Sequence, residues 1–425
     1  MAEERKIVVV GGGLAGLCCA RTLQRAGYTA HVYEASDGVG GRVRTDHVKG
    51  FQIDRGFQDL LTAYPAVKQE INLAALQPGA FDPGALVHWN KRLYPVADPL
   101  RKPSYALTSA FTPLFPLKDK ARVARLLTFL LPLSVDEIFK LPDTSMETFL
   151  RGFGFSDAFL DRFLRPFFAG VFLENKLETS ARMFAFVFKM LAIGQTALPA
   201  EGMGALPQQI ADDLRPGTLH LNSPVQELTR SRERVTGIKL EDGTMVAADR
   251  VVVAIEADKA AALTGLDLPV EWRVSTDITF DLPERLYRQK LLVLFTEPGA
   301  LVNNCALVSN VVPSYAPEGR HLLSATVLGD PDLSDEELAD RAKAEIAGAF
   351  PRSHPQDWKL LRVYRIRWAQ YAQPAGIWDR LPSTRTGMPG LILAGEITSS
   401  SSLYGALVSG QKAAGLAMSV AEDIG

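Results

Sequence analysis

The chain has 425 residues, 47% of them hydrophobic and 22% charged, with a formal net charge of −2. This length suggests two or three domains with a large core. The near-neutral charge gives no sign of a nucleic-acid partner or of a strongly steered ionic substrate. The three cysteines form no disulfide framework, which is typical of a reducing compartment. The six histidines lack metal-ligand spacing, so we expect no metal.

The position of the first predicted strand leaves no room for a signal peptide before it. No apolar run approaches the roughly 18 residues that a membrane-spanning helix needs. We therefore expect a cytoplasmic protein. Peripheral membrane contact stays an alternative, because a basic stretch precedes the apolar residues 126–131. The interpretation of that stretch as a solvated face on a packed helix is favoured over membrane contact by roughly two to one. The basic residues are Lys118, Lys120, Arg122 and Arg125.

Residues 6–45 carry the first functional signal. Ile7–Val10 is a β-branched run, typical of a strand buried on both faces, and a helical pattern follows and ends at Gly27. Between strand and helix lies the pattern Gly-x-Gly-x-x-Gly, formed by Gly11, Gly13 and Gly16. These glycines allow a tight turn and close approach of the backbone to a pyrophosphate at the helix N-terminus. Glu34 ends a second predicted strand and suits a ribose hydroxyl, so the segment predicts dinucleotide binding.

Residues 60–195 have a different character, because phenylalanine, leucine and proline crowd together and β-branched runs vanish. The pattern predicts helices near 119–131, 145–152, 156–165 and 179–192. Ser156 or Asp157 can cap the third helix, and Pro166 is expected to end it. This region is therefore predicted to be a mostly helical insertion with much apolar surface.

The remaining chain alternates between strand and helix patterns. After a helix at 205–214, strands are predicted at 219–221, 225–229, 235–240, 244–247 and 250–255. Further strands are predicted at 278–280, 291–295, 322–328, 361–368 and 390–395. Ser334 and Glu337 form a predicted capping box before a helix that ends at residue 350. A final helix is predicted from about 405 to 421.

The pattern typical of nucleotide binding thus occurs in three separated pieces. We expect residues 1–60, 196–265 and 370–425 to form one discontinuous domain. Residues 61–195 and 266–369 are expected to form a second domain, the first part mainly helical and the second rich in strands. A nicotinamide dehydrogenase usually keeps its cofactor domain in one run, so the interleaving favours a flavoprotein.

A longer signature follows the second strand: Glu34-Ala-Ser-Asp-Gly-Val-Gly-Gly-Arg42, then Arg44-Thr45. It resembles the N-terminal signature of the flavin amine oxidase and phytoene desaturase superfamily, and the likeness covers most of the chain. The resemblance implies an α/β fold, with a Rossmann-type FAD-binding domain built on a parallel sheet and a substrate domain of mixed sheet and helices. In that superfamily the second glycine pair and the arginine lie against the FAD pyrophosphate, as a guanidinium can bind phosphate bidentately.

Other short motifs resemble the superfamily's flavin-binding segments. Asp54 and Gly56 resemble the motif that leads to the flavin ring, and Ser223-Pro-Val225 resembles the strand whose backbone contacts the adenine. Leu393-Ala-Gly-Glu396 resembles the C-terminal motif near the ribityl chain, and residues 405–410 resemble the start of the last helix, which faces the flavin. The predicted cofactor-binding residues are Gly11, Gly13, Leu14, Ala15, Gly16, Glu34, Ala35, Gly40, Gly41, Arg42, Gly56, Phe57, Gln58, Val225, Gly395, Glu396, Gly405, Ala406 and Leu407. FAD is expected to be non-covalent, because no cysteine lies near the C-terminal flavin loop.

Weaker signals concern the branch of the superfamily. Amine oxidases that resemble this chain place an aromatic cage residue three positions before the glycine of the final helix, where this sequence has Ser402, and Tyr404 is expected to point elsewhere. Those oxidases often carry a lysine that holds a water near flavin N5, and Lys290 is the candidate for that role. Segments such as 198–204 and 368–374 are more similar to desaturase-like relatives, so we place the chain closer to that branch.

These features favour hydride transfer from a C–H bond of an apolar, isoprenoid- or carotenoid-like substrate to flavin N5. About a quarter of the phenylalanines in the helical insertion are expected to touch that substrate. No acid–base pair stands out, so no catalytic side chain is assigned, and the electron acceptor, quinone or oxygen, stays open. The alternatives are an amine oxidase that releases hydrogen peroxide, an FAD-dependent isomerase or hydratase without net redox change, and a flavin-binding protein without turnover.

Overall fold

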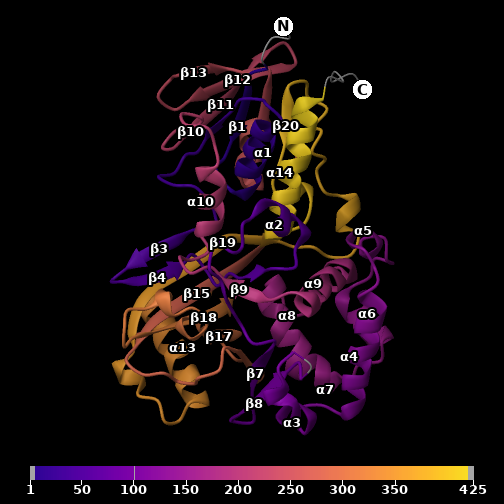
Figure 1. Cartoon of the computed structure of the whole chain (residues 1–425), viewed down its shortest axis with the longest axis vertical. Helices are drawn as coiled ribbons and strands as arrows, with labels where there is room; N and C mark the ends of the chain where they lie inside the picture. Colours follow the sequence, from indigo (N-terminus) through magenta and orange to yellow (C-terminus); the bar gives the residue numbers. More distant parts are fainter. Residues whose placement is uncertain (1–4, 100, 420–425) are drawn as a thin grey trace.

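The computed structural model describes residues 5–99 and 101–419, which form two lobes joined by a narrower middle (Figure 1). The upper lobe contains a five-stranded sheet in the order β10-β2-β1-β14-β20, and every neighbouring pair is parallel. The predicted α/β class with a parallel sheet is therefore confirmed. The strands come from three separated stretches of sequence: β1 (Ile7–Val10), β2 (Ala30–Tyr33), β10 (Leu219–His220), β14 (Arg250–Val253) and β20 (Leu391–Leu393).

Alternate residues of β1 face two separate cores, as expected for a strand buried on both faces. Ile7 and Val9 pack with apolar side chains of the first and last helices, whereas Val8 and Val10 pack with those of a second, three-stranded sheet. That sheet is antiparallel, in the order β11-β12-β13. The other elements of this lobe are α1 (Leu14–Arg25), α10 (Ala205–Asp212), α11 (Ala257–Thr264), α14 (Leu403–Met418), β11 (Val225–Ser231), β12 (Arg234–Leu240) and β13 (Met245–Ala247).

The lower lobe is built on a seven-stranded sheet in the order β19-β15-β18-β17-β16-β7-β8. All its neighbouring pairs are antiparallel except β16 and β7, which are parallel, so the sheet is mixed. Two of its strands are much longer than any strand of the upper lobe's parallel sheet. The strands are β7 (Gly84–Trp89), β8 (Arg92–Ala97), β15 (Trp272–Leu282), β16 (Leu292–Phe295), β17 (Asn304–Leu307), β18 (His321–Leu328) and β19 (Lys359–Tyr371).

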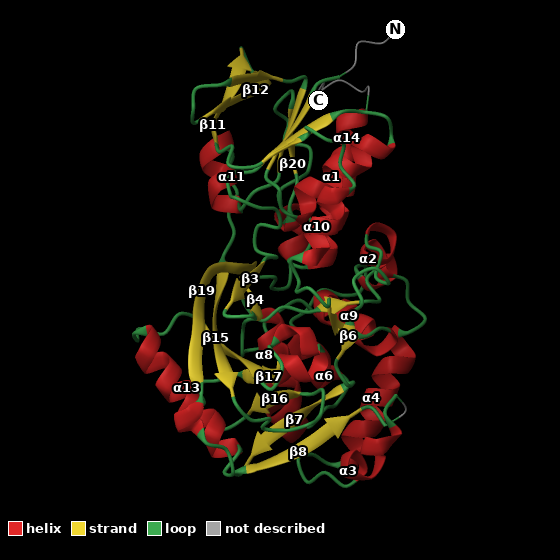
Figure 2. Cartoon of the chain, turned by 60° about the vertical axis from the view of Figure 1, so that its left-hand side comes forward, coloured by secondary structure: helices red, strands yellow, loops and turns green. Residues whose placement is uncertain are grey.

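Helices cover the two faces of this sheet and enclose two cores. Helix α13 lies along one side of the β15–β19 end, and α4, α6 and α8 lie on the other side (Figure 2). The α13 side contains Ile278, Phe280 and Ile346, and the other side contains most of the phenylalanines. The helices of this lobe are α3 (Ala106–Ala110), α4 (Leu117–Leu130), α5 (Val135–Ile138), α6 (Met146–Gly152), α7 (Asp157–Phe159), α8 (Arg165–Phe172), α9 (Ala181–Ile193), α12 (Val308–Val311) and α13 (Asp335–Ala349).

Short elements connect the lobes. The hairpin of β3 and β4 and the helix α2 lie near the middle of the molecule in Figure 1. Arg21 of α1 forms a buried ion pair with Glu70 of α2, with Nη2 and Oε2 2.6 Å apart. The connecting elements are β3 (Thr45–Val48), β4 (Phe51–Asp54), β5 (Leu60–Leu61), α2 (Pro65–Glu70), β6 (Gly79–Ala80) and β9 (Thr196–Leu198).

The expectation that Pro166 ends a helix is wrong. The chain passes from α7 through a π-helical turn, Leu160–Leu164, directly into α8, and Pro166 lies in the first turn of α8. A proline is tolerated in a first helical turn because its missing N–H would have no partner there. The change of hydrogen-bond register at the π-helical turn therefore lets the helical path continue through Pro166.

Within residues 60–195, which were predicted to be mostly helical, β7 and β8 form a hairpin that extends the lower sheet and that no predicted element anticipated. The turn between them contains Asn90 and Lys91, both with positive φ (49° and 57°). Two successive positive φ values are typical of a two-residue hairpin turn, for which asparagine is favoured at the first position. The asparagine at position 90 could therefore have predicted this hairpin from the sequence.

Other predicted elements are confirmed. Ser334 and Glu337 form the capping box of α13, with both reciprocal hydrogen bonds present. The last helix begins at Leu403 and ends at Met418, and the predicted end at residue 421 lies outside the described residues. Within residues 5–99 and 101–419, no helix combines the length and apolar character that crossing a membrane requires.

Candidate functional site

Two glycine-rich loops meet beyond the carboxyl ends of β1 and β2. Gly11 N donates to Tyr33 O (2.8 Å), which ties the first loop to β2. Gly40 N, in the second loop, donates to Gly12 O (2.8 Å), and Gly13 pairs with Gly40 as a short parallel bridge. The structure therefore brings the glycines predicted from two separate motifs into one backbone cluster at the N-terminus of α1.

The glycines of this cluster have different physical roles. A methyl group added to Gly16 would lie 2.0 Å from Gly11 O, so this glycine is needed for the helix to pack on the loop. A methyl group added to Gly13 would meet no atom within 4 Å. Gly13 therefore borders open space, and the N-terminal N–H groups of α1 lie at that point. The arrangement fits the pyrophosphate of a dinucleotide.

Glu34 lies beside the same loop. Its Oε2 accepts a hydrogen bond from Gly12 N (2.6 Å), and its Oε1 accepts from Ser36 N and Oγ (2.9 and 2.6 Å). Ser223 N donates to Glu34 O (2.8 Å), which brings the segment before Val225 against the end of β2. Ala35 is exposed there. Glu34 is thus oriented at the edge of the glycine loop, as a ribose-binding carboxylate requires.

Arg42 and Glu396 come from opposite ends of the chain and meet as an ion pair, with Nη1 and Oε1 2.6 Å apart. Arg42 Nη1 also donates to the backbone oxygens of Trp368 and Ala369 (both 3.1 Å). Glu396 is buried, and its Oε2 accepts from Ser401 Oγ (2.8 Å). The predicted N-terminal and C-terminal motifs are therefore neighbours, and the Arg42 guanidinium is held beside the glycine cluster.

The start of α14 lies next to the turn that carries Glu396. Ser402 is the N-cap of α14, because its Oγ accepts from Gly405 N (2.9 Å). A methyl group added to Gly405 would lie 1.9 Å from Ser400 O, so the close approach of this turn requires glycine. Tyr404 packs on Tyr64 and Phe186, with ring centroids 5.7 and 4.9 Å apart. The position where amine oxidases carry a cage aromatic is thus a helix cap, and Ala406 and Leu407 continue the first turn.

The loop of Gly56, Phe57 and Gln58 follows β4 and faces both lobes. Gln58 Nε2 donates to Arg42 O (2.8 Å) and Arg55 O (3.2 Å), so the loop is tied to the Gly-Gly-Arg segment. Gln58 Oε1 is buried and accepts no hydrogen bond from the described part of the chain. A methyl group added to Gly56 would lie 2.4 Å from Ile366 Cδ1.

A pair of carboxyl groups, Asp54 partly buried and Asp277 fully buried, lies beside this loop. Asp54 accepts from Thr45 Oγ1 (2.5 Å), Met203 N (2.9 Å) and Tyr315 Oη (2.8 Å). Burial raises the pKa of Asp54, although these three donors oppose the rise. Asp277 of β15 is 1% exposed, and among the described residues only Ser324 Oγ donates to its carboxylate (2.8 Å). Burial raises the pKa of Asp277 to about 7, and the charge of Asp54 adds to that rise.

Sequence reasoning missed Asp277, although β15 carried a signal. Four polar residues alternate along it at positions 275, 277, 279 and 281, within a lobe that was expected to be apolar. They are Ser275, Asp277, Thr279 and Asp281, all of them buried. A polar face of period two on a buried strand indicates that those side chains face a polar space.

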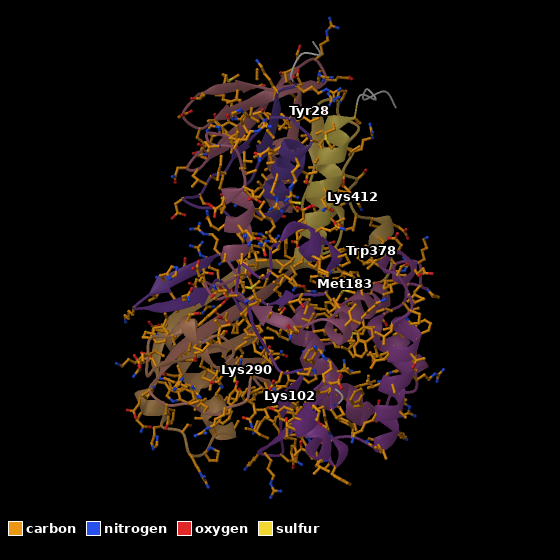
Figure 3. All side chains as sticks on the ribbon, in the orientation of Figure 1. Tyr28, Lys102, Met183, Lys290, Trp378 and Lys412 are labelled. Carbon is orange, nitrogen blue, oxygen red and sulfur yellow. The ribbon has the colours of Figure 1, made fainter. Side chains whose placement is uncertain are left out.

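Lys290, the candidate for a lysine near flavin N5, has a different environment. It lies in the lower lobe (Figure 3), and its Nζ is 3.5 Å from Val311 O. Its backbone oxygen accepts from Asp82 N (2.8 Å). These contacts give Lys290 a role in connecting loops at the β7–β16 side of the sheet. Among the described residues, no group of three or more His, Cys, Asp or Glu side chains is placed to hold a metal ion.

Comparison with known proteins decides the family. The model of the family described as flavin containing amine oxidoreductase matches residues 14–418. The chain belongs to this family. The resemblance found in the sequence is therefore confirmed, and this flavin containing amine oxidoreductase is a flavin-dependent enzyme.

Relatives that match over nearly their full length are similar to it at low identity. The chain is 25% identical to the probable zeta-carotene desaturase of Synechococcus elongatus, over 96% of this chain and 98% of that protein. It is 24% identical to hydroxysqualene dehydroxylase of Sinorhizobium fredii, over 98% and 99%. The solved structure of putrescine oxidase with putrescine bound has the same fold (TM-score 0.70, 18% identity, 97% and 99% coverage).

Proposed function

We propose that this flavin containing amine oxidoreductase binds FAD without a covalent link and removes hydride from a C–H bond of an apolar isoprenoid substrate. The observation that carries the substrate class is the aromatic cluster at the start of α14. Tyr64, Phe186 and Tyr404 pack there on one another, at the helix that resembles the family's flavin-facing segment. Apolar surroundings of this kind favour a hydrocarbon over a protonated amine, and Ser402 occupies the cage position.

The phenylalanines of the helical layer extend this apolar region away from the flavin loops. Phe155, Phe159, Phe163 and Phe167 stack along one continuous helical path, with successive ring centroids 5.2, 5.7 and 5.9 Å apart. Phe163 and Phe167 are only half-buried. The two full-length relatives are named for zeta-carotene and hydroxysqualene, which are long isoprenoids, and this agrees with the proposal.

The residues that would hold FAD each have a separate task. The two glycine loops and Arg42 bind the pyrophosphate, Glu34 binds the adenosine ribose, and the start of α14 lies against the flavin ring. Bound FAD supplies the hydride acceptor, and the protein positions the substrate carbon and excludes water. Cys18, Cys19 and Cys305 are buried, and none belongs to a motif assigned to the flavin ring, which supports non-covalent binding.

Anaerobic flavin bleaching tests this proposal. The purified holoenzyme is mixed with zeta-carotene or hydroxysqualene in detergent micelles, with putrescine as the matched amine, and flavin absorbance is followed. We expect an isoprenoid to bleach the flavin and putrescine to leave it oxidised. Bleaching by putrescine alone, with peroxide formed on admitting air, would contradict the substrate class. Heat denaturation is expected to release FAD into the supernatant, and flavin retained on the precipitated chain would contradict non-covalent binding.

We further propose that the lower lobe docks on a lipid membrane through the segment of α3 and the start of α4, at the bottom of Figure 1. Leu107, Phe111 and Leu117 are 75%, 82% and 71% exposed there, and the exposed Lys118 follows. Large apolar side chains beside a lysine match the acyl and headgroup layers of an anionic bilayer. In the apolar run at residues 126–131, Leu126 and Leu130 are buried, whereas Phe129 and Leu131 are 40% and 43% exposed.

Sedimentation with phosphatidylglycerol-containing vesicles tests this surface. The double variant Leu107→Ser/Phe111→Ser is expected to lose most of its vesicle-bound fraction. Met245→Ser is the matched control, because Met245 is 62% exposed in β13 of the other lobe. Equal vesicle binding by wild type and the double variant would reject the surface.

A further inference from the structure

A small cavity lies between the Gly56–Phe57–Gln58 loop and the lower sheet. Its volume is about 20 Å³, which is room for about one water molecule. Its polar lining comes from four different parts of the chain: Asp54, Gln58, Asp277, Thr279, Tyr315 and Ser324. The cavity therefore connects β15 of the substrate-side lobe with the loop that resembles the family's approach to the flavin ring.

Two buried groups on this lining have fewer donors than they can accept. Gln58 Oε1 is buried without a hydrogen-bond partner in the described residues. The Asp277 carboxylate, on a residue only 1% exposed, accepts from Ser324 Oγ alone among those residues. A single water can donate one hydrogen bond to each acceptor, which would satisfy both. Gln58 Nε2 donates to the backbone oxygens of Arg42 and Arg55, so Gln58 links the cavity to the Gly-Gly-Arg segment.

Asp277 differs from the neighbouring carboxyl group in its capacity to take up a proton. Asp54 has three donors, which stabilise its charged form, whereas Asp277 has one. The titratable groups around the cavity or directly opposite Asp277 are Asp54 of β4, Tyr315 and, on β19, Tyr364. Arg362 of β19 lies opposite Thr279, two residues along β15 from Asp277. Burial and hydrogen bonds to carboxylates raise the pKa of both tyrosines, so they stay neutral near pH 7.

We propose that Asp277 is the proton-exchanging group of this enzyme, acting through a water held between its carboxylate and Gln58. The inference rests on the proposed function, in which FAD is the two-electron oxidant. In substrate oxidation one C–H bond breaks and its electron pair leaves as hydride for the oxidised flavin. A neighbouring C–H bond breaks, its electron pair forms the C=C bond, and its proton passes to the water, which releases a proton to the Asp277 carboxylate. The substrate loses two hydrogens, and Asp277 gains one proton.

The direction of the pH effect follows from burial. Burial raises the pKa of Asp277 to about 7, so the group is ionised and able to accept a proton only as the pH rises through neutrality. Ser324 donates to the charged form and lowers the pKa. Removing that donor should therefore move the ionisation of Asp277 to higher pH.

Infrared titration of the oxidised holoenzyme tests the protonation directly and needs no substrate. We expect a carboxylic-acid carbonyl band that disappears as pH rises through about 7. The band should be lost in Asp277→Asn and should persist to higher pH in Ser324→Ala. It should be unchanged in Asp281→Asn, whose carboxylate lies on the same strand and pairs with Arg320. Burial also raises the pKa of Asp59 to about 6, so the Asp59 band should disappear at lower pH and be lost in Asp59→Asn. A component that titrates near pH 7 and persists in Asp277→Asn, or that Asp59→Asn removes instead, would overturn the assignment.

Proton uptake on flavin photoreduction tests the coupling. With a pH-indicator dye at pH 8, wild type is expected to take up more protons per flavin than Asp277→Asn, up to one more, because reduction adds negative charge to the flavin. Ser324→Ala keeps the carboxyl group but raises the pKa of Asp277, so its extra uptake should appear at a higher pH than in wild type, which separates the role of Asp277 from a folding defect. Equal uptake by wild type and Asp277→Asn would overturn the proposal. Failure of isoprenoids to bleach the flavin would instead reject the substrate class, since photoreduction uses none.

Discussion

The two lobes of this enzyme differ in how their site residues are specified. In the upper lobe, the proposed cofactor site consists of backbone turns at the ends of very short strands, and each turn is specified by a few neighbouring residues. In the lower lobe, β15 has 11 residues and places Asp277 and Thr279 at a cavity whose other lining residues come from distant parts of the chain. Dinucleotide binding depends on backbone geometry, whereas substrate chemistry depends on side-chain position. Motifs therefore describe the first lobe better than the second.

The largest effect is expected from Gly16→Val in the upper lobe. The new side chain would start 2.0 Å from Gly11 O, so the first strand and helix could not pack, with an expected loss of about 5 kcal/mol or more in unfolding free energy. Gly13→Ala is the matched control. Gly13 has φ −77°, and its added methyl group would meet open space, so we expect normal stability but weaker FAD binding. Urea unfolding and flavin content measure the two effects, and equal loss of stability in both variants would contradict this division of roles.

Phe184→Ala should have the next largest effect and act on the lower lobe. Phe184 is fully buried and its ring contacts Phe149, Phe168 and Phe188. Truncation should cost about 4 kcal/mol of unfolding free energy, through lost burial and the cavity left behind. Phe111→Ala is the control, since Phe111 is 82% exposed and its loss should change stability by less than about 0.5 kcal/mol. A comparable effect of the two substitutions on the free energy of unfolding in urea would contradict the placement of Phe184 in the core and of Phe111 on the surface.

The pH dependence of stability should distinguish Asp277 from carboxylates that are stabilised by donors. The folded protein holds a proton on Asp277 up to about pH 7, and the unfolded chain releases it near the ordinary aspartate pKa of 3.8. Between these values the folded state binds more protons, so this group destabilises the fold as pH rises, by on the order of 2 kcal/mol from pH 5 to pH 8. Asp277→Asn should reduce this fall. Urea unfolding at pH 5 and pH 8 measures it, and the same pH slope in both proteins would contradict the buried neutral acid.

The smallest effect is expected from Ser402→Ala at the start of α14. Loss of the hydrogen bond from Gly405 N to Ser402 Oγ should cost about 1 kcal/mol. Ser402→Asp keeps a capping acceptor and should restore stability, while its negative charge should disfavour the anionic reduced flavin. Thermal unfolding measures the first effect, and the reduction potential measures the second. A potential that stays unchanged in Ser402→Asp would place this cap away from the flavin.

Several local features were predictable because one short segment determines each of them. The turn at Gly11 and Gly13 and the capping box of Ser334 and Glu337 depend on residues a few positions apart. The hairpin at Asn90 was predictable on the same grounds but was missed. Pro166 misled the prediction because the π-helical turn before it changes the hydrogen-bond register, and no local pattern indicates such a turn.

By itself, then, the sequence determined the α/β class, the flavin family and the residues that form the glycine loops, because backbone turns depend on local residue type. Only the tertiary structure decided that Arg42 meets Glu396, and that Asp277 faces Gln58 across a cavity. Those partners are hundreds of residues apart in the sequence, so no local pattern indicates that the fold brings them together. The protonation of Asp277 follows from the same cause, since a carboxyl group becomes neutral near pH 7 only when the fold removes it from water and leaves it one donor.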